Sequence, residues 1–135
     1  MAGTALIADD DKRFRATLRM LIEGVVHVVG EAESDDEAIS LARELEPDAI
    51  LIALDLPRAG GIETLRQIRR GQPEVFVVLM TARGEEAYLE ATGKSGADAF
   101  LPKKYVRAEA RGVLRRLFAG ARRPWERPRD PRDRR

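Results

Sequence analysis

The chain reads ALIADDD at residues 5–11, where four apolar residues run directly into three carboxylates. Four further short apolar runs follow before residue 102, and an amphipathic segment comes after each run. Strands that are apolar on consecutive residues are typical of a parallel sheet with helices on both faces. The alternation therefore predicts an α/β domain built from five strand-helix pairs.

The boundaries of these elements can be read from the apolar runs and the residues that punctuate them. We expect five strands, at Ala5–Ala8, Val25–Gly30, Ala49–Leu54, Val75–Met80 and Ala99–Leu101. We expect five helices, at Lys12–Glu23, Asp35–Glu46, Ile62–Arg70, Glu85–Lys94 and Val106–Phe118. Asp11 and Ser34 stand where N-caps of the first two helices belong, and Pro47 follows the second helix, which supports these limits.

Composition limits the class of protein. The 135 residues are 44% hydrophobic and 35% charged, with a formal net charge of +1, as in an ordinary globular domain. There is no cysteine, which excludes disulfides and thiolate chemistry. No apolar run reaches the roughly 18 residues of a membrane span, and the first residues lack the features of a secretory signal, so we expect a cytoplasmic protein.

The last fifteen residues differ from the rest of the chain. Residues 121–135 hold seven arginines and three acidic residues, a net charge of +4, which leaves −3 for residues 1–120. Three prolines interrupt this segment, and Trp125 is its one large apolar residue. We expect a domain over residues 1–120 and a flexible tail or linker over 121–135. Nucleic-acid binding by the tail is disfavoured because acidic residues break up its positive charge.

Polar side chains gather where the expected strands end. In an open parallel sheet, the loops beyond the carboxyl ends of the strands form the functional site. Asp9 and Asp10 follow the first strand, Thr81 follows the fourth and Lys103 follows the fifth. Two carboxylates suit Mg²⁺, while a hydroxyl and an ammonium suit phosphoryl oxygens. Each residue by itself has an ordinary structural explanation, and only their joint placement indicates a phosphoryl site.

Several short motifs occur in a fixed order along the chain. They are residues 5–10 (ALIADD), 28–32 (VVGEA), 47–52 (PDAILI), 56–57 (LP) with Gly61, 81–82 (TA), and 96–101 (GADAFL) with Lys103. Together they resemble the receiver domain of two-component response regulators, most closely the NarL/FixJ group, from residue 5 to about residue 120. This resemblance implies a flavodoxin-like (βα)₅ fold, in which a five-stranded parallel sheet is sandwiched by five helices.

The resemblance also implies a chemistry and a role for each matching residue. A receiver takes a phosphoryl group from a histidine kinase onto an aspartate at the end of its third strand, with Mg²⁺ bound. Asp9 and Asp10 would hold the metal, Thr81 would be the switch hydroxyl, Lys103 would contact the phosphoryl group, and Phe100 would be the aromatic residue that changes rotamer.

The partners implied are a sensor histidine kinase or a phosphotransfer protein. Receivers often form homodimers through the fourth helix, the fifth strand and the fifth helix, so a homodimer of that kind is a further expectation. We do not expect this chain itself to be an enzyme.

Residue 53 departs from the family. The acceptor aspartate stands four residues before the proline of the following loop, which is Pro57 here, and that position is Ala53. A methyl group has no lone pair that could attack phosphorus, so phosphorylation at this position is excluded. The change also removes a metal ligand, so we expect weaker Mg²⁺ binding, and Lys103 loses the carboxylate expected beside it.

Two origins of Ala53 remain open. Retention of Asp9, Asp10, Thr81 and Lys103 favours an engineered Asp→Ala substitution, which locks a receiver in its unphosphorylated state. The alternative is a natural pseudo-receiver that acts as a phosphorylation-independent protein-interaction module. A nucleotide or flavin binder of similar fold is disfavoured, because no glycine-rich phosphate loop follows the first strand.

Two loop positions carry secondary expectations. Asp55 stands two residues after the acceptor position, too late to replace it, and we expect it to pair with Arg83 at the rim of the pocket. Lys104 stands where many receivers have a proline after a cis peptide bond. Because a cis bond before a non-proline residue costs about 2.5–4 kcal/mol, we expect a trans bond here.

Overall fold

The five strands form one parallel sheet in the spatial order β2-β1-β3-β4-β5. The computed structural model describes residues 3–82, 84, 93 and 95–120. The strands are β1 (Gly3–Ala8), β2 (Val26–Ala32), β3 (Ala49–Ala53), β4 (Phe76–Thr81) and β5 (Ala99–Pro102). The helices are α1 (Lys12–Ile22), α2 (Asp35–Leu45), α3 (Gly60–Gly71), the short 3₁₀ helix η1 (Lys103–Tyr105) and α5 (Val106–Phe118). None of these described helices is both long and apolar enough to cross a membrane.

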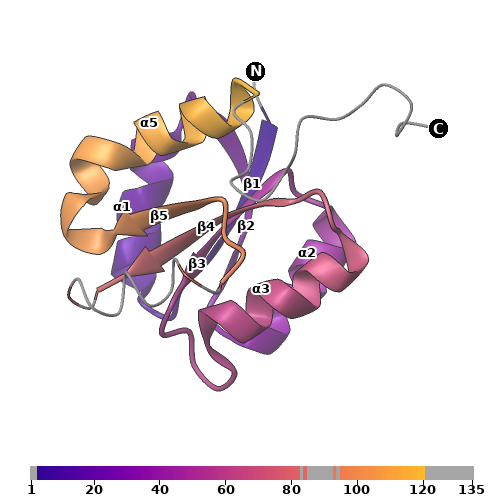
Figure 1. Cartoon of the computed structure of the whole chain (residues 1–135). Coiled ribbons are helices and arrows are strands. Elements are labelled where there is room, and N and C mark those ends of the chain that lie inside the picture. The colour runs from indigo at the N-terminus through magenta and orange to yellow at the C-terminus, as the bar shows by residue number, and fades with distance from the viewer. Residues whose placement is uncertain (1–2, 83, 85–92, 94, 121–135) are drawn as a thin grey trace, which may run out of the picture.

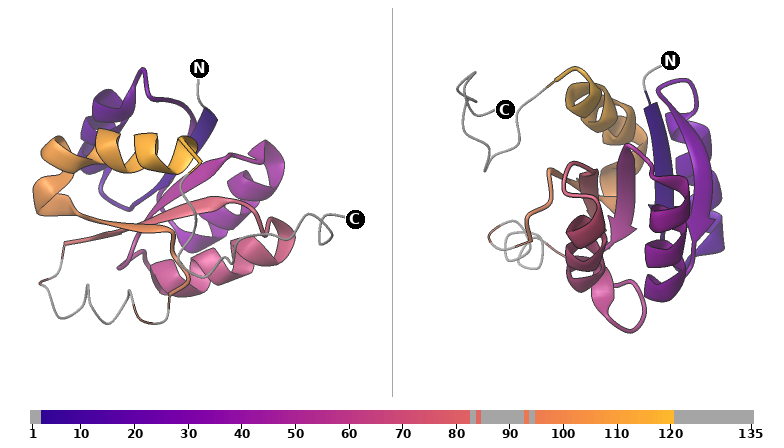
Figure 2. Two further views of the ribbon diagram at one scale, coloured as in Figure 1. Left: turned by 45° about the horizontal axis from the view of Figure 1, so that its top comes forward. Right: turned by 90° about the vertical axis from the view of Figure 1, so that its right-hand side faces the viewer.

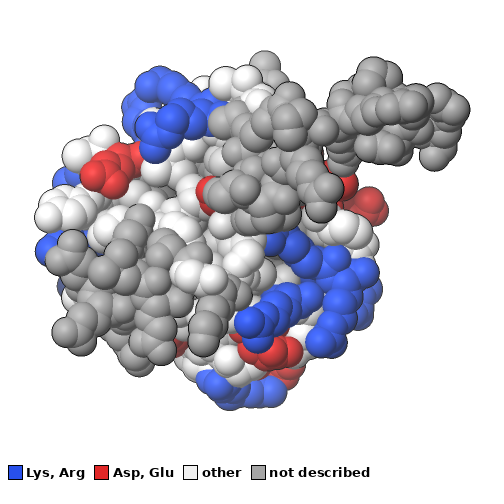
Figure 3. All heavy atoms as spheres, viewed as in Figure 1, with Lys and Arg blue, Asp and Glu red and all other residues white. Residues whose placement is uncertain are grey.

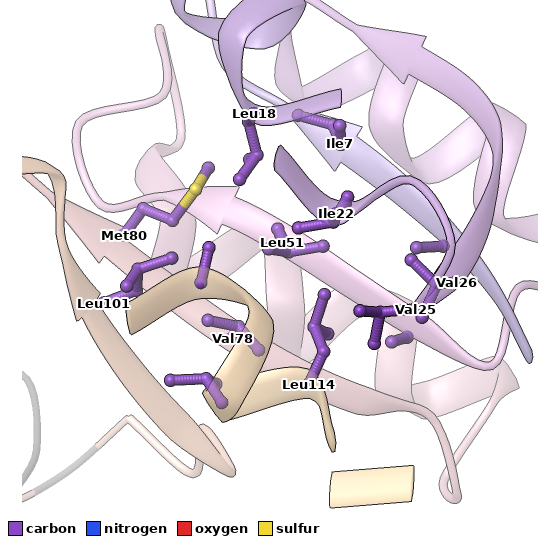
Figure 4. Close-up of a cluster of buried hydrophobic side chains, with 14 of the residues drawn as sticks. Ile7, Leu18, Ile22, Val25, Val26, Leu51, Val78, Met80, Leu101 and Leu114 are labelled. Atoms are coloured by element: carbon purple, nitrogen blue, oxygen red, sulfur yellow. The ribbon is translucent and has the colours of Figure 1, made fainter. Parts of the chain in front are cut away.

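Helices cover both faces of the sheet. α1 and α5 pack on one face, and α2 and α3 pack on the other (Figures 1 and 2). Leu51 of β3 faces the α1/α5 core, where it meets Leu18 and Leu114 (Figure 4). Its neighbours Ile50 and Ile52 face the α2/α3 core. Since successive residues of a strand point to opposite faces, this two-sided burial accounts for the continuous apolar run in β3.

The predicted order of elements is confirmed wherever the structure describes them. The expected helix Glu85–Lys94 lies outside the described residues, except for Gly93. The largest error in the predicted bounds is two residues, as at α3, which begins at Gly60 rather than Ile62. Two side-chain hydrogen bonds support the earlier start of the helix. Asp35 accepts the Ala59 N–H at 3.1 Å, and the Thr64 hydroxyl donates to the Gly60 carbonyl at 2.7 Å.

Both predicted helix caps are confirmed. The Asp11 carboxylate accepts the N–H groups of Arg13 and Phe14 at 2.9 and 3.1 Å, so α1 begins directly after the loop that carries Asp9. The Ser34 hydroxyl likewise accepts the N–H of Glu37 at 3.3 Å. A side-chain cap of this kind contributes about 1 kcal/mol. The Asp11 cap stands three residues after the end of β1, which limits the position of the residues just beyond β1.

Candidate functional site

The strand register brings the predicted site residues to one edge of the sheet. Ala53 of β3 lies opposite Met80 of β4, and Thr81 lies opposite Pro102 of β5. β1, which lies on the other side of β3, ends one residue before Asp9. The strand order reverses between β1 and β3, and in open α/β sheets ligand sites form at such a reversal. The candidate site is therefore the edge of the sheet at the carboxyl ends of β1, β3, β4 and β5, called the cleft below after the crevice expected for this strand order.

Alternation along the strands divides the site residues between the two faces. Ala53 is fully buried and follows the alternation of Leu51, which faces the α1/α5 core. Thr81 is buried as well and follows Met80, a member of the same core, so its side chain turns to the opposite face. Phe100 is half-buried and packs against the α2/α3 core. The two predicted switch residues thus share the α2/α3 side of the sheet.

Asp9 and Lys103 are in direct contact. The Nζ of Lys103 lies 2.5 Å from Oδ2 of Asp9, whose side chain is fully buried, while the Lys103 side chain is 17% exposed. The other carboxylate oxygen of Asp9 accepts the Asp11 N–H at 2.9 Å. The ammonium also lies 4.4 Å from the centre of the Phe14 ring, within the range of a cation-π interaction. Although residue 53 offers no carboxylate, Lys103 therefore has a partner in the loop directly after β1.

A buried arginine holds the backbone of Asp9. Arg15 of α1 donates from Nη1 to the Asp9 carbonyl at 2.6 Å, and from Nε to Glu31 of β2 at 2.9 Å. Arg15 is not among the site residues predicted from the sequence. A signal was present, because Arg15 stands three and seven residues before Leu18 and Ile22, on the apolar stripe of the expected helix.

Glu31 completes this network between α1 and β2. Its second carboxylate oxygen accepts Nη1 of Arg19 at 2.6 Å. Partial burial opposes ionisation of Glu31, but the hydrogen bonds from Arg15 and Arg19 outweigh it and lower its pKa below the ordinary value of 4.5. Glu31 therefore carries its negative charge at neutral pH and ties α1 to β2.

The corner after Ala53 is held by backbone contacts. Leu54 donates its N–H to the Met80 carbonyl at 2.6 Å, and Leu56 donates to the Ala53 carbonyl at 3.2 Å. Gly61 donates to the Leu54 carbonyl at 2.9 Å, and a Cβ at position 61 would overlap the carbonyl oxygen of Ala53. Only glycine lets α3 approach the end of β3 this closely.

Asp35 ties the loop after β3 to the start of α2. Burial opposes its ionisation, but the N–H groups of Ala59 and Asp36 donate to the carboxylate at 3.1 and 2.7 Å and lower its pKa below 3.8. Arg58, which has a left-handed backbone with φ of 76°, forms ion pairs with Asp35 and Asp36. The loop that follows residue 53 is thus fixed at its far end.

The remaining predicted residues are not brought into the cleft by any described contact. Asp10 is exposed in the loop after β1, and Asp55 is exposed in the loop after β3. Arg83 lies outside the described residues, so its expected pair with Asp55 stays a prediction. All described peptide bonds are trans, and the prediction for the bond before Lys104 is confirmed.

The residues of the cleft, as arranged, do not fit Mg²⁺. This ion requires near-octahedral oxygen ligands, usually one or two carboxylates together with several waters. One carboxylate oxygen of Asp9 accepts the Asp11 N–H, the other has no hydrogen bond among the described residues but is held in an ion pair by Lys103, and residue 53 has no oxygen in its side chain. Within the described part of the chain, no group of three or more His, Cys, Asp and Glu residues is placed to hold a metal.

Two grooves lie away from this cleft. One, of about 610 Å³, runs between α2 and α3 and includes Ile39, Arg43, Ile68 and Arg70 in its lining. The other, of about 420 Å³, lies next to Phe118 at the opposite ends of the strands. Figure 3 shows Lys and Arg side chains gathered over the side of the molecule where Figure 1 places α2 and α3. No predicted site residue lines either groove.

Sequence comparison finds relatives that match most of the chain. A family model, the response regulator receiver domain, matches residues 5–115. The response regulator GacA of Pseudomonas aeruginosa is 36% identical over 120 residues, which cover 87% of this chain and 56% of the relative. The transcriptional regulatory protein ResD of Bacillus subtilis is 38% identical over 110 residues, or 82% of this chain and 45% of the relative. The chain thus spans about half the length of these curated relatives.

Solved structures share the fold. A two-component response regulator of the LuxR family from Aurantimonas sp. SI85-9A1 is 30% identical and superposes with a TM-score of 0.82, covering 92% of this chain and 91% of that one. The signal receiver domain of NarL from Mycobacterium tuberculosis is 27% identical, with a TM-score of 0.78 over 87% of this chain and 97% of that one. The flavodoxin-like fold predicted from the sequence is confirmed.

Proposed function

The chain belongs to the response regulator receiver domain family of two-component signalling, and from this premise we propose that it is a receiver locked in the unphosphorylated state. The observation that carries the proposal is Ala53, a buried methyl group at the end of β3 where the family has its phosphoacceptor. Phosphoryl transfer requires a nucleophilic atom with a lone pair, in line with the phosphorus atom. Ala53 supplies none.

Asp55 is a poor replacement for the missing acceptor. It stands in the loop beyond β3 and is exposed, whereas residue 53 is fully buried in the sheet between β1 and β4. Residues 53–56 form a turn closed by the hydrogen bond from the Leu56 N–H to the Ala53 carbonyl at 3.2 Å, so Asp55 stands on this corner, outside the strand. We therefore assign no phosphoacceptor role to Asp55.

The Asp9–Lys103 pair supports a locked cleft. In the proposed receiver, these two side chains neutralise each other at 2.5 Å, with Asp9 fully buried. The ammonium that would contact a phosphoryl oxygen is therefore committed to Asp9. Breaking a buried ion pair of this kind is costly, which favours a single arrangement of the loop after β5.

A locked receiver acts through the proteins that bind it. We propose a sensor histidine kinase or a phosphotransfer protein as its partner, together with a homodimer contact that includes β5 and α5. Tyr105, at the start of α5, favours that surface because its large aromatic side chain is 48% exposed. The fourth helix, which the homodimer would also use, lies outside the described residues.

The lock has a direct test. The chain and its Ala53→Asp variant are titrated with beryllofluoride and Mg²⁺, and amide chemical shifts are followed by NMR. We expect shifts near Thr81, Phe100 and Lys103 in the Ala53→Asp variant only. Incubation with acetyl phosphate and intact-mass analysis should add one phosphoryl group to that variant and none to the parent chain.

A control variant tests whether Asp55 accepts a phosphoryl group in place of residue 53. If the parent chain responds fully and Asp55→Asn abolishes the response, Asp55 is the acceptor and the proposed lock is wrong. The codon for residue 53 in the encoding gene separates the two origins: an aspartate codon supports an engineered lock, and an alanine codon supports a natural phosphorylation-independent interaction module.

A further inference from the structure

We infer that the Lys103 ammonium is the resident counter-cation of Asp9 and that it keeps Mg²⁺ out of the cleft. This inference assigns a regulation of the same cleft and rests on the proposed function only in that residue 53 carries no carboxylate. In a receiver, a divalent metal would be the expected cation beside Asp9. Here, the ion that balances Asp9 belongs to the chain itself.

Asp9 is fixed on three sides, so it cannot turn to meet a metal elsewhere. One carboxylate oxygen accepts the Asp11 N–H at 2.9 Å, the other lies 2.5 Å from Lys103, and the Asp9 backbone carbonyl accepts the Arg15 guanidinium at 2.6 Å. The side chain is fully buried. A metal that bound Asp9 would have to take the place of the Lys103 ammonium on the same oxygen.

The Lys103 ammonium is held by two contacts, one with Asp9 and one with the ring of Phe14. Lys103 follows directly after β5, and its ammonium is enclosed between Asp9 and the ring of Phe14, 4.4 Å from the ring centre. Moving the ammonium away would leave the buried carboxylate of Asp9 without a cation and the ammonium without its aromatic contact. Metal binding to Asp9 must therefore offset the free energy of both lost contacts.

Charge balance explains why residue 53 decides between the two cations. Asp9 and Lys103 sum to zero; of the other two carboxylates in the same loop, Asp10 is exposed and Asp11 caps α1. A carboxylate at residue 53 would lie on the strand between Asp9 and Lys103 and restore a net negative charge, which is what a divalent cation requires. With alanine there, the pair is already neutral.

The experiment measures metal binding without any phosphoryl donor. The full chain, Lys103→Met and the control Lys104→Met are titrated with MgCl₂ and, separately, with NaCl at matched ionic strength while the unfolding temperature is recorded. Mn²⁺ is then added, and paramagnetic broadening of the Asp9, Asp10 and Asp11 amide signals is followed by NMR. Lys104 is the matched control because it is exposed and lies 5.1 Å from the Tyr105 ring.

We expect Lys103→Met to bind Mg²⁺ at least about tenfold more tightly than the parent chain, while Lys104→Met should match the parent. Ala53→Asp, which keeps Lys103, should gain affinity by a similar factor. Should Lys103→Met not fold, Lys103→Gln provides the same test, since it keeps a hydrogen-bond donor and removes the charge.

Two results would overturn the inference: Mg²⁺ binding by the parent chain as tight as in the charge-removing variant, or no gain in that variant. Because no phosphoryl donor is present, either result leaves the absence of phosphorylation at residue 53 as a separate question. Failure of the inference and failure of the proposed lock are therefore distinguishable.

Discussion

Two ion pairs in this molecule have nearly identical burial. In the cleft, Lys103 lies 2.5 Å from Asp9, and at the junction of α3 with the residues before β5, Arg69 lies 2.6 Å from Asp98. Both carboxylates are fully buried, and the two cations are 17% and 16% exposed. By the count of charges and the distance between them, the pairs are equivalent.

They differ in how many other groups each partner holds. Arg69 also donates to the carbonyls of Gly96 and Val75, and Asp98 accepts the N–H of Val77 at 2.7 Å. The planar guanidinium suits such multiple contacts, whereas an ammonium is a point charge on a flexible stem. The comparison teaches that equal charge and burial can serve a structural clamp with several acceptors in one place and a single counter-cation at the candidate site in another.

The largest effect is expected from removing the clamp. Arg69→Met should lower the free energy of unfolding by about 3–5 kcal/mol, because it leaves the Asp98 carboxylate buried without its cation. Urea denaturation followed by circular dichroism measures the change. Arg69→Lys keeps the charge and should recover only part of the loss, since one ammonium cannot reach all the acceptors. If Arg69→Lys were as stable as the parent chain, the multiple contacts of the guanidinium would not be needed and the role of Arg69 as a clamp would be contradicted.

Removing the cation of the cleft should cost less. Lys103→Met should lower the free energy of unfolding by about 1–3 kcal/mol, since Asp9 lies at the edge of the sheet beside an exposed loop. Mg²⁺ at matched ionic strength should restore part of this stability, and it should restore none in Arg69→Met. An equal response of both variants to Mg²⁺ would remove the distinction between the two pairs.

The more exposed cluster of Arg15, Arg19 and Glu31 extends the comparison, because its contribution to stability depends on pH. Glu31, whose side chain is 27% exposed, has a pKa lowered by its arginine partners. Its contribution is therefore present above pH 4.5 and is lost as the pH falls through the lowered folded-state pKa. Glu31→Gln should cost about 1 kcal/mol at pH 7, and the difference should shrink in denaturation curves recorded below pH 4.5. A pH-independent difference would point to packing instead.

The smallest effect is expected at the exposed member of the acidic triplet. Asp10→Asn should change the free energy of unfolding by less than about 0.5 kcal/mol, because its side chain is exposed. Asp11→Ala, which removes the α1 cap, should cost about 1 kcal/mol in the same assay. A loss at Asp10 equal to that at Asp11 would show a contact for Asp10 beyond those described.

The elements could be predicted because each depends on neighbours in the sequence. Strands such as Ala49–Ala53 are apolar on consecutive residues, and α1 follows directly on its capping residue Asp11. The grouping of Asp9 and Lys103 at one sheet edge also followed from the strand order that a βα repeat imposes.

The individual side-chain partners could not be predicted in the same way. The pairing of Asp9 with Lys103 depends on which rotamer the lysine adopts once residue 53 has no carboxylate, and no pattern along the chain specifies that. The contact between Arg15 and the Asp9 carbonyl likewise depends on how α1 is turned against β2. Such choices are made by packing between segments distant in sequence.

The backbone corner formed by Ala53 and Gly61 has a consequence for how this receiver can change over time. Main-chain hydrogen bonds hold the end of β3, and α3 can approach it closely because Gly61 has no side chain. These contacts use the carbonyl of residue 53 and the missing Cβ of Gly61, so a change of the side chain at residue 53 leaves the groups that make them in place.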